Sequence, residues 1–256
     1  MKLLDIHAHL NFPDYDQDRD AVIAKLTAAE CGVINVGADL ATSREVVELT
    51  NQPNFWATVG LHPHAALNEI DWKTFESLAA HNRVVAIGEC GLDFFRLPTD
   101  EAERSSIIAR QAEVFERQIE VAARLGKPLM LHIREAYDEV LAILKRHPGV
   151  RGNAHFFAGS LAQAKAFLEL GFTLSFTGVV TFTNDYDEVI RATPVDQLLV
   201  ETDSPYVAPV PHRGQRNEPL YVAEVAKRVA ELKGVGVEEL WTQVLATAGR
   251  VFGLHN

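Results

Sequence analysis

The chain has 256 residues, of which 47% are hydrophobic and 23% charged, and its formal net charge at pH 7 is −11. A chain of this length and composition can bury a full core and has the usual size of one α/β barrel, so we expect a single domain over residues 1–256. The acidic balance disfavours a protein that binds nucleic acid through a broad basic surface. Any polyanion must therefore be bound locally.

The N-terminal segment and the cysteine count indicate a cytoplasmic protein. The segment MKLLDIHAHL has one lysine and a short apolar run interrupted by Asp5, which fits neither a signal peptide nor a membrane span. Cys31 and Cys90 are too few for a disulfide framework or a cysteine-based zinc site, and we expect both in the core. We expect no membrane partner and no obligate protein partner.

Along the chain, short apolar runs rich in β-forming residues alternate with longer segments of helical periodicity. The predicted strands are Leu3–His7, Val33–Gly37, Phe55–Gly60, Val84–Gly88, Pro128–His132, Gly152–Phe156, Phe172–Phe176 and Leu198–Glu201. The predicted helices are Asp16–Ala29, Ser43–Thr50, Trp72–Ala80, Glu101–Leu125, Ala136–Arg146, Leu161–Leu170, Tyr221–Lys233 and Glu238–Phe252. Strands that alternate with helices predict a parallel sheet.

Two folds contain such a sheet, a closed (β/α)8 barrel and an open doubly wound sheet, and the glycines and motifs decide between them. Gly126 and Gly171 stand where a helix must end before the next strand, as helix C-caps do. No G-x-G-x-x-G follows the first strand, and eight strands suit closure, so we predict an α/β fold of the (β/α)8 TIM-barrel type rather than an open sheet. The Pro-, Gly- and Arg-rich segment Ser204–Pro219 is predicted to be a long loop at the barrel mouth.

Histidines and acids stand at the ends of several predicted strands. His7 and His9 are two residues apart, so the period of a strand points both imidazoles to one side, which is half of a metal site or a pair of satisfied polar residues. Further strands end at Glu89, His132, His155 and Asp203. The carboxyl ends of barrel strands converge on one face, where isolated polar residues would otherwise be costly to bury. Four imidazoles and two carboxylates suit zinc or a similar ion and suffice for two cations.

The chain resembles the TatD family of metal-dependent deoxyribonucleases, within the amidohydrolase-like barrels. The resemblance spans nearly the whole chain and is carried by DIHAHL, VGLHPH, IGECGLDFFR, KPLMLHIREA, AHFFAGS, ETDSPY and RGQRNEP, in this order. It implies that one cation is bound by His7, His9, Glu89 and Asp203, and a second by Glu89, His132 and His155. Glu89 would then bridge the two.

Asp203 and Glu89 are the predicted catalytic residues. Two cations that share a carboxylate lower the pKa of a bound water and stabilise charge on a phosphoryl oxygen. Asp203 is the candidate acceptor of the water proton, with a role as a plain ligand as the alternative. Glu201 shares the facing of Asp203, so it either orients a metal-bound imidazole or forms a structural salt bridge. Asp93 and Arg96 are candidates for residues around the ligands or at the rim.

Substrate contacts are expected from His62, Arg134 and Arg213. His62 and His64 share a facing at the end of the third strand, and His62 is the candidate phosphate contact. Guanidinium groups fork onto phosphate oxygens, and the alternative for Arg134, Arg213 and also Arg216 is an ion pair that stabilises a loop. Four phenylalanines near the barrel mouth are candidates either for stacking on bases or for packing, namely Phe94, Phe95, Phe156 and Phe157. The remaining histidines are expected to be solvated, namely His81, His147, His212 and His255.

The function predicted from the residues is metal-dependent hydrolysis, and the resemblance implies DNA as the substrate, single-stranded or at its ends, with exonuclease action. The same activated water also attacks carbonyl groups, so hydrolysis of a carboxylic ester or amide, such as an aminoacyl-tRNA ester or a small cyclic amide, is the alternative. A metal-binding protein without turnover would leave Asp203 and the arginines without a role. Histidine and carboxylate ligands suit Zn, Mn and Co and, less well, Mg.

Overall fold

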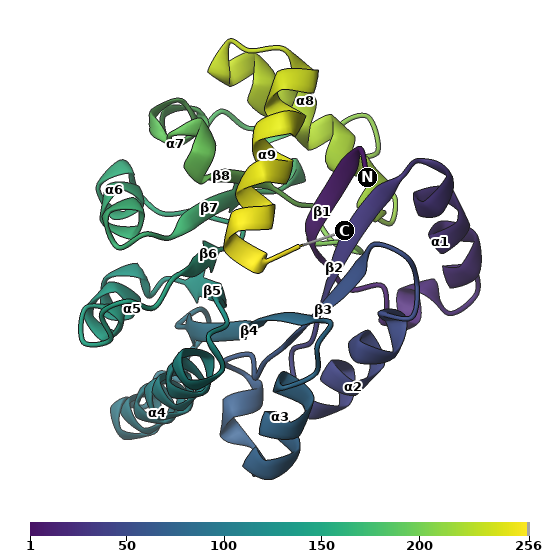
Figure 1. The fold of residues 1–256 in the computed structure, drawn as a ribbon. Coiled ribbons are helices and arrows are strands. Elements are labelled where there is room, and N and C mark those ends of the chain that lie inside the picture. Colours follow the sequence, from purple (N-terminus) through teal and green to yellow (C-terminus); the bar gives the residue numbers. More distant parts are fainter. Residues whose placement is uncertain (255–256) are drawn as a thin grey trace.

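The computed structural model describes residues 1–254, which form a barrel of parallel strands surrounded by helices (Figure 1). The eight-stranded sheet has the order β1-β2-β3-β4-β5-β6-β7-β8, and each neighbouring pair is parallel. The strands are β1 (Leu3–Ala8), β2 (Cys31–Val36), β3 (Phe55–Val59), β4 (Val84–Asp93), β5 (Leu129–Arg134), β6 (Gly152–Ala154), β7 (Thr173–Phe176) and β8 (Leu198–Val200). The predicted (β/α)8 barrel is confirmed.

The helices surround the barrel in chain order, except that the last one lies across one end of the barrel (Figure 1). They are α1 (Arg19–Ala28), α2 (Leu40–Leu49), α3 (Trp72–Ala79), α4 (Glu101–Leu125), α5 (Tyr137–Leu144), α6 (Leu161–Glu169), α7 (Asp187–Ala192), α8 (Val222–Lys233) and α9 (Val237–Phe252). The sequence prediction missed α7, because six residues are too few to show a helical period. None of the described helices is both long and apolar enough to cross a membrane.

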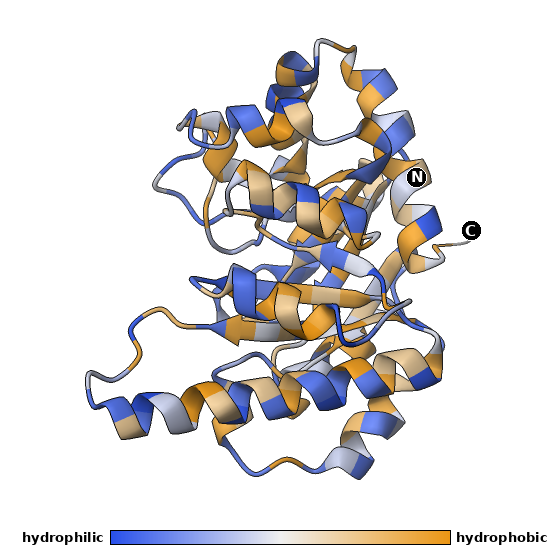
Figure 2. Cartoon of the chain, turned by 90° about the vertical axis from the view of Figure 1, so that its left-hand side faces the viewer, coloured by the Kyte–Doolittle hydropathy of each residue, from blue (hydrophilic) through white to orange (hydrophobic). Residues whose placement is uncertain are grey.

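Local sequence signals explain where the longest helix begins and ends. The Asp100 side chain accepts a hydrogen bond from the backbone N–H of Glu103 at the start of α4. Gly126 ends the helix in the left-handed conformation with φ 66°, as the sequence predicted. Figure 2 shows hydrophobic residues gathered in the strands, whereas the helices alternate between hydrophilic and hydrophobic residues along their length.

Residues after β8, rather than the strand itself, close the barrel against β1. The N–H of Asp203 donates to the carbonyl of His7 at 2.9 Å, and the N–H of His9 donates to Ser204 at 2.8 Å. Below them, the fully buried Asp5 carboxylate accepts from the N–H of Thr202 at 2.9 Å and from its hydroxyl. Burial raises the pKa of Asp5 well above its usual value. This closure places Asp203 beside the histidines of β1.

Strand β4 is longer than predicted, because it resumes beyond a bulge. The register with β5 shifts between Ile87 and Cys90, and pairing then continues to Asp93. Two glycines let the backbones approach here. A Cβ on Gly60 would lie 2.1 Å from the carbonyl carbon of Gly88, and Gly88 itself has φ 152°. Glu89 therefore lies within a strand rather than after one, and its N–H donates to the carbonyl of Gly37 at 3.0 Å.

Candidate metal centre

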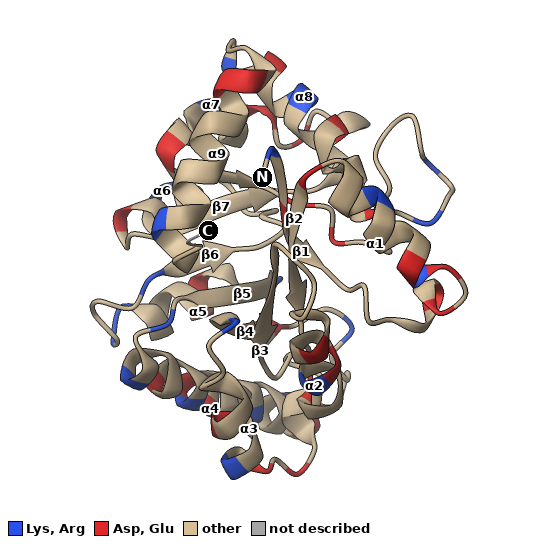
Figure 3. Cartoon of the chain, turned by 45° about the vertical axis from the view of Figure 1, so that its right-hand side comes forward, with Lys and Arg blue, Asp and Glu red and all other residues tan. Residues whose placement is uncertain are grey.

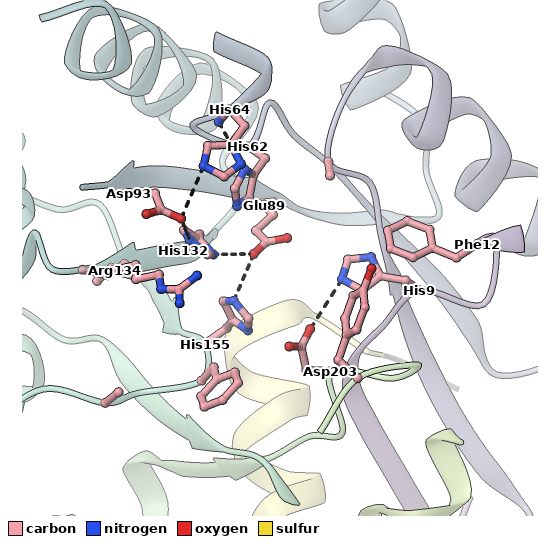
Figure 4. Close-up of a pocket in the computed structure, with 15 residues that line it drawn as sticks. His9, Phe12, His62, His64, Glu89, Asp93, His132, Arg134, His155 and Asp203 are labelled. Atoms are coloured by element: carbon pink, nitrogen blue, oxygen red, sulfur yellow. Dashed lines mark hydrogen bonds and ion pairs between the residues drawn. The ribbon is translucent and has the colours of Figure 1, made fainter. Parts of the chain in front are cut away.

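The six predicted metal ligands come together at the carboxyl ends of the strands (Figure 4). His7 lies on β1, Glu89 on β4 and His132 on β5. His9 and His155 directly follow β1 and β6, and Asp203 is the third residue after β8. They surround the floor of a pocket of about 700 Å³ that is also lined by His62, Arg134, Phe12 and Tyr206. His7 is fully buried below this floor.

The first group of donor atoms has the spacing of a cation site. Nε2 of His7 lies 3.3 Å from Nε2 of His9, 3.8 Å from Oε2 of Glu89 and 3.7 Å from Oδ1 of Asp203. Nε2 of His9 lies 3.6 Å from the same Asp203 oxygen. Donor atoms about 2.0–2.2 Å from one ion in a tetrahedral arrangement lie about 3.3–3.6 Å apart. The nitrogen–oxygen distances are too long for hydrogen bonds, so two imidazoles and two carboxylates fit a shared divalent cation.

The second group is joined by direct hydrogen bonds. Oε1 of Glu89 lies 2.8 Å from Nδ1 of His132 and 3.0 Å from Nε2 of His155. Glu89 thus presents one oxygen to each group of histidines, as a bridging carboxylate does. Two imidazoles and one carboxylate are a donor set that suits zinc or a related ion.

The charges in this group are strongly coupled. Burial alone would raise the pKa of Glu89, but the positive charges and hydrogen bonds of His155 and His132 hold it well below the usual value. Burial would conversely lower the pKa of His132 and of His155, but the surrounding carboxylates raise both. Protons and a cation therefore compete for the same ring nitrogens.

Partners on the far side of three imidazoles orient the nitrogen that faces the site. Nδ1 of His9 lies 3.0 Å from the carbonyl of Val36. Nε2 of His132 lies 3.1 Å from Oδ2 of Asp93, which leaves Nδ1 of the ring facing Glu89. Nδ1 of His155 lies 3.4 Å from Oε1 of Glu201, an ion-pair distance. Of the two sequence-based alternatives for Glu201, this geometry favours the one in which it orients an imidazole.

Further hydrogen bonds hold Glu201 in place. Its Oε1 accepts from the N–H of Phe156 at 2.5 Å, and its Oε2 accepts from the hydroxyl of Ser175 at 2.9 Å. Glu201 is fully buried. The carboxylate is therefore fixed against His155 by the turn that follows β6 and by strand β7.

His62 lies next to the second group of donors. Its ring lies 4.2 Å from that of His132, and its ring, Glu89 and His132 each offer a donor atom within 4.8 Å of the others. The backbone N–H of His64 donates to Nδ1 of His62 at 3.2 Å, which leaves the ring proton on Nε2. Burial lowers the pKa of His62 to about 3, so the ring is a neutral donor. His64 is exposed, 3.7 Å from Asp93.

The three candidate arginines have different surroundings. Arg134 lies at the pocket with its guanidinium 3.4 Å from the centre of the Phe95 ring, and within residues 1–254 no carboxylate lies at ion-pair distance from it. Arg213 lies 3.7 Å from the Phe182 ring and does not line the pocket. Arg216 pairs with Asp18 at 2.6 and 2.7 Å. This is the ion pair that stabilises a loop, which the sequence offered as the alternative to a phosphate contact.

Two aromatic residues of the pocket were not singled out in the sequence. Phe12 and Tyr206 follow the ligands His9 and Asp203, each by three residues, and this spacing was the available signal. Among the predicted phenylalanines, Phe156 lines the pocket, Phe95 lies under Arg134, and Phe94 and Phe157 pack in or against the core.

The remaining sequence predictions concern residues away from the pocket. Cys31 and Cys90 are buried, as predicted. His81 is exposed, whereas His147 is partly buried near Glu116 and His212 stacks on Tyr221 at 3.7 Å. Arg96 is exposed over Phe95, and His255 lies outside the described residues.

A parallel eight-stranded barrel with histidines and carboxylates gathered at the carboxyl ends of its strands is typical of metal-dependent hydrolases. The family model described as TatD related DNase matches residues 4–253, and the chain belongs to this family. The chain is 39% identical to the uncharacterized metal-dependent hydrolase YabD of Bacillus subtilis, a similarity that covers 99% of this chain and 100% of that protein.

Two further relatives extend the comparison. The chain is 33% identical to a protein of Erwinia amylovora named 3'-5' ssDNA/RNA exonuclease TatD, over 98% of this chain and 100% of that protein. The crystal structure of YJJV, a TatD homolog from Escherichia coli K12, superposes with a TM-score of 0.89 at 28% identity and covers 99% of each chain. The protein is thus a metal-dependent hydrolase of the TatD family.

Proposed function

We propose that the protein removes nucleotides from the ends of DNA chains by metal-dependent hydrolysis of phosphodiester bonds. The observation that carries this proposal is one pocket that joins five of the six candidate ligands, with His7 buried beneath them, to the guanidinium of Arg134, which has no carboxylate partner among residues 1–254. A site for an anion beside a cation-binding cluster suits a phosphodiester better than a neutral amide. The description of the family and the name of the Erwinia amylovora relative support nucleic acid as the substrate.

The proposed ligands are His7, His9, Glu89 and Asp203 for one divalent cation, and Glu89, His132 and His155 for a second. Bound cations would lower the pKa of a water molecule and neutralise the charge that builds on a phosphoryl oxygen. The imidazole-rich donor set favours Zn or Mn over Mg.

The side chains of the pocket supply the remaining chemistry. Asp203, whose side chain is 15% exposed, faces both the histidines of β1 and the pocket, so it accepts the proton of the attacking water. The Nε2–H of His62 donates to a phosphoryl oxygen, a role that its fixed tautomer permits. Arg134 binds the neighbouring phosphate. Arg213, outside the pocket, would contact only a longer strand.

The direct test is hydrolysis of single-stranded DNA labelled at either end, by protein stripped of metal and then supplied with Zn, Mn or Mg. We expect shortening of the DNA only after metal is restored, beginning at the 3′ end as the name of the Erwinia relative indicates. RNA of the same sequence is compared alongside.

The Asp203→Asn variant is the control for a contaminating nuclease. It keeps a ligand oxygen but cannot accept a proton, and we expect it to fold and to lose about 100-fold or more of the activity. Intact DNA after incubation with fully metal-loaded protein would overturn the proposal. Turnover of aminoacyl esters or cyclic amides in its place would assign the centre to carbonyl substrates.

A further inference from the structure

Two aromatic side chains form one wall of the pocket, and we call Phe12 and Tyr206 the aromatic wall. Tyr206 is 53% exposed although it lies three residues after the candidate catalytic base, Asp203. Its ring meets that of Phe12 edge to face at 6.3 Å, and the Phe12 ring stacks on His9 at 4.5 Å with an angle of 17°. The wall therefore continues directly from a candidate metal ligand.

The backbone on both sides of the wall is held rigidly, while the Tyr206 ring is left open. The N–H of Tyr206 donates to the carbonyl of Asp203 at 3.0 Å, and its carbonyl accepts from the buried Asn217 side chain at 2.6 Å. The carbonyl of Phe12 accepts from the guanidinium of Arg19 at 3.1 Å. Because this backbone is already ordered, it loses little further conformational entropy when a flat ligand packs on the exposed ring.

A cation stands on the opposite side of the pocket. Figure 4 shows Arg134 and Phe12 on opposite sides of the ligand cluster. The Arg134 guanidinium lies 3.4 Å from the centre of the Phe95 ring, a cation–π contact that leaves its charge unneutralised. The pocket thus offers a flat apolar wall on one side of the ligands and a positive charge on the other, and its volume of about 700 Å³ is that of a site for a molecule of nucleotide size.

We propose that the aromatic wall binds the base of the terminal nucleotide by stacking on Tyr206, so that the scissile phosphate lies over the candidate ligands and the next phosphate reaches Arg134. This proposal rests on the proposed nuclease function and names its specificity subsite. Stacking accepts every base, because each has a π-face, so the site selects an end that carries a base rather than a particular sequence.

The test crosses the variant Tyr206→Ala with removal of the base. Single-stranded DNA ending in an ordinary nucleotide is compared with the same DNA ending in an abasic nucleotide. The abasic nucleotide is placed at the 3′ end in one substrate and at the 5′ end in another. We expect Tyr206→Ala to lose about fivefold or more in kcat/KM on the ordinary end and far less on the abasic end. Tyr206→Phe keeps the aromatic ring and should, unlike Tyr206→Ala, retain the preference for an end that carries a base.

The matched control is Phe182→Ala, which removes another exposed aromatic ring outside the pocket. Any loss in this variant should be equal on the two substrates. An equal loss for Tyr206→Ala on both substrates, or none on either, would overturn the stacking proposal while the nuclease function stands. Absence of cleavage of both substrates by wild-type protein loaded with metal would overturn the nuclease function itself.

Discussion

Glu89 is the residue on which both groups of candidate ligands depend. One of its oxygens faces His7, and the other contacts His132 and His155. It is 5% exposed, and the imidazoles around it keep its carboxyl group ionised, as the lowered pKa indicates. A single side chain therefore couples the two halves of the proposed centre.

Replacement of this residue should affect metal content and activity together. We expect Glu89→Ala to lose at least one bound metal per chain and nearly all hydrolysis, because it removes a donor from both groups. Metal analysis and kinetics on the same sample give the result. The matched control is Glu188→Ala, which removes an exposed acid on α7 and should retain both properties. Normal turnover by Glu89→Ala would contradict the assignment.

The contact between Glu201 and His155 predicts that Glu201 acts through this imidazole rather than on substrate. Glu201→Gln keeps the size of the side chain but removes the charge that favours a proton on Nδ1 of His155. We expect metal affinity to fall about 10- to 100-fold. Activity should return at high metal concentration. Competition with a chromophoric chelator measures the affinity, and an affinity equal to that of the wild-type protein would show that Glu201 has a structural role only.

Single residues differ in how far the sequence reveals them. Alternation along a strand sufficed to pair His7 with His9, because a strand dictates the facing of its side chains. It did not distinguish Arg134 from Arg216, since the Asp18 partner of Arg216 is distant in sequence and only the folded chain brings them together. Tyr206 was missed for the same reason: its exposure depends on neighbouring loops.

At the scale of elements, the centre depends on the close contact of β3, β4 and β5. Gly60 and Gly88 permit this contact, and Glu89 follows directly. The sequence placed the end of β4 at Gly88, because the apolar run stops there. It did not reveal that pairing with β5 resumes after a bulge, since a bulge depends on the facing strands.

A methyl group at this contact should displace Glu89. We expect Gly60→Ala to lower the free energy of unfolding by about 1–3 kcal/mol and to reduce hydrolysis at least about tenfold, because the new Cβ would meet backbone atoms that cannot move aside. Urea denaturation and kinetics measure the two effects. Gly236→Ala, where a Cβ meets nothing within 4 Å, is the control. Equal behaviour of the two variants would show that the contact is not required.

On the scale of the whole molecule, the candidate ligands come from strands on both sides of the barrel. A cation between them therefore links segments from β1 to the residues after β8, across the closure of the sheet. The alternation of strands and helices was sufficient to predict this barrel, since each element shows its own period. The charged residues of both signs on the outer helices carry no such information about the site (Figure 3).

Removal of the metal should lower the stability of the entire barrel. Saturation at about 100 times Kd contributes about 2.7 kcal/mol, which corresponds to a fall in Tm of about 5–11 °C on chelation. Thermal denaturation with and without a chelator measures this shift. The Glu89→Ala variant should show a much smaller shift, and an equal shift in both proteins would indicate that the stabilising metal is bound elsewhere.

The most direct measurement is anomalous diffraction from crystals loaded with Mn or Zn, recorded for the wild-type protein. We predict two peaks that share Glu89, one among His7, His9 and Asp203 and the other between His132 and His155. Peaks at other side chains, or none in crystals of protein that is active with the same metal, would contradict the claim that these six residues form the metal centre.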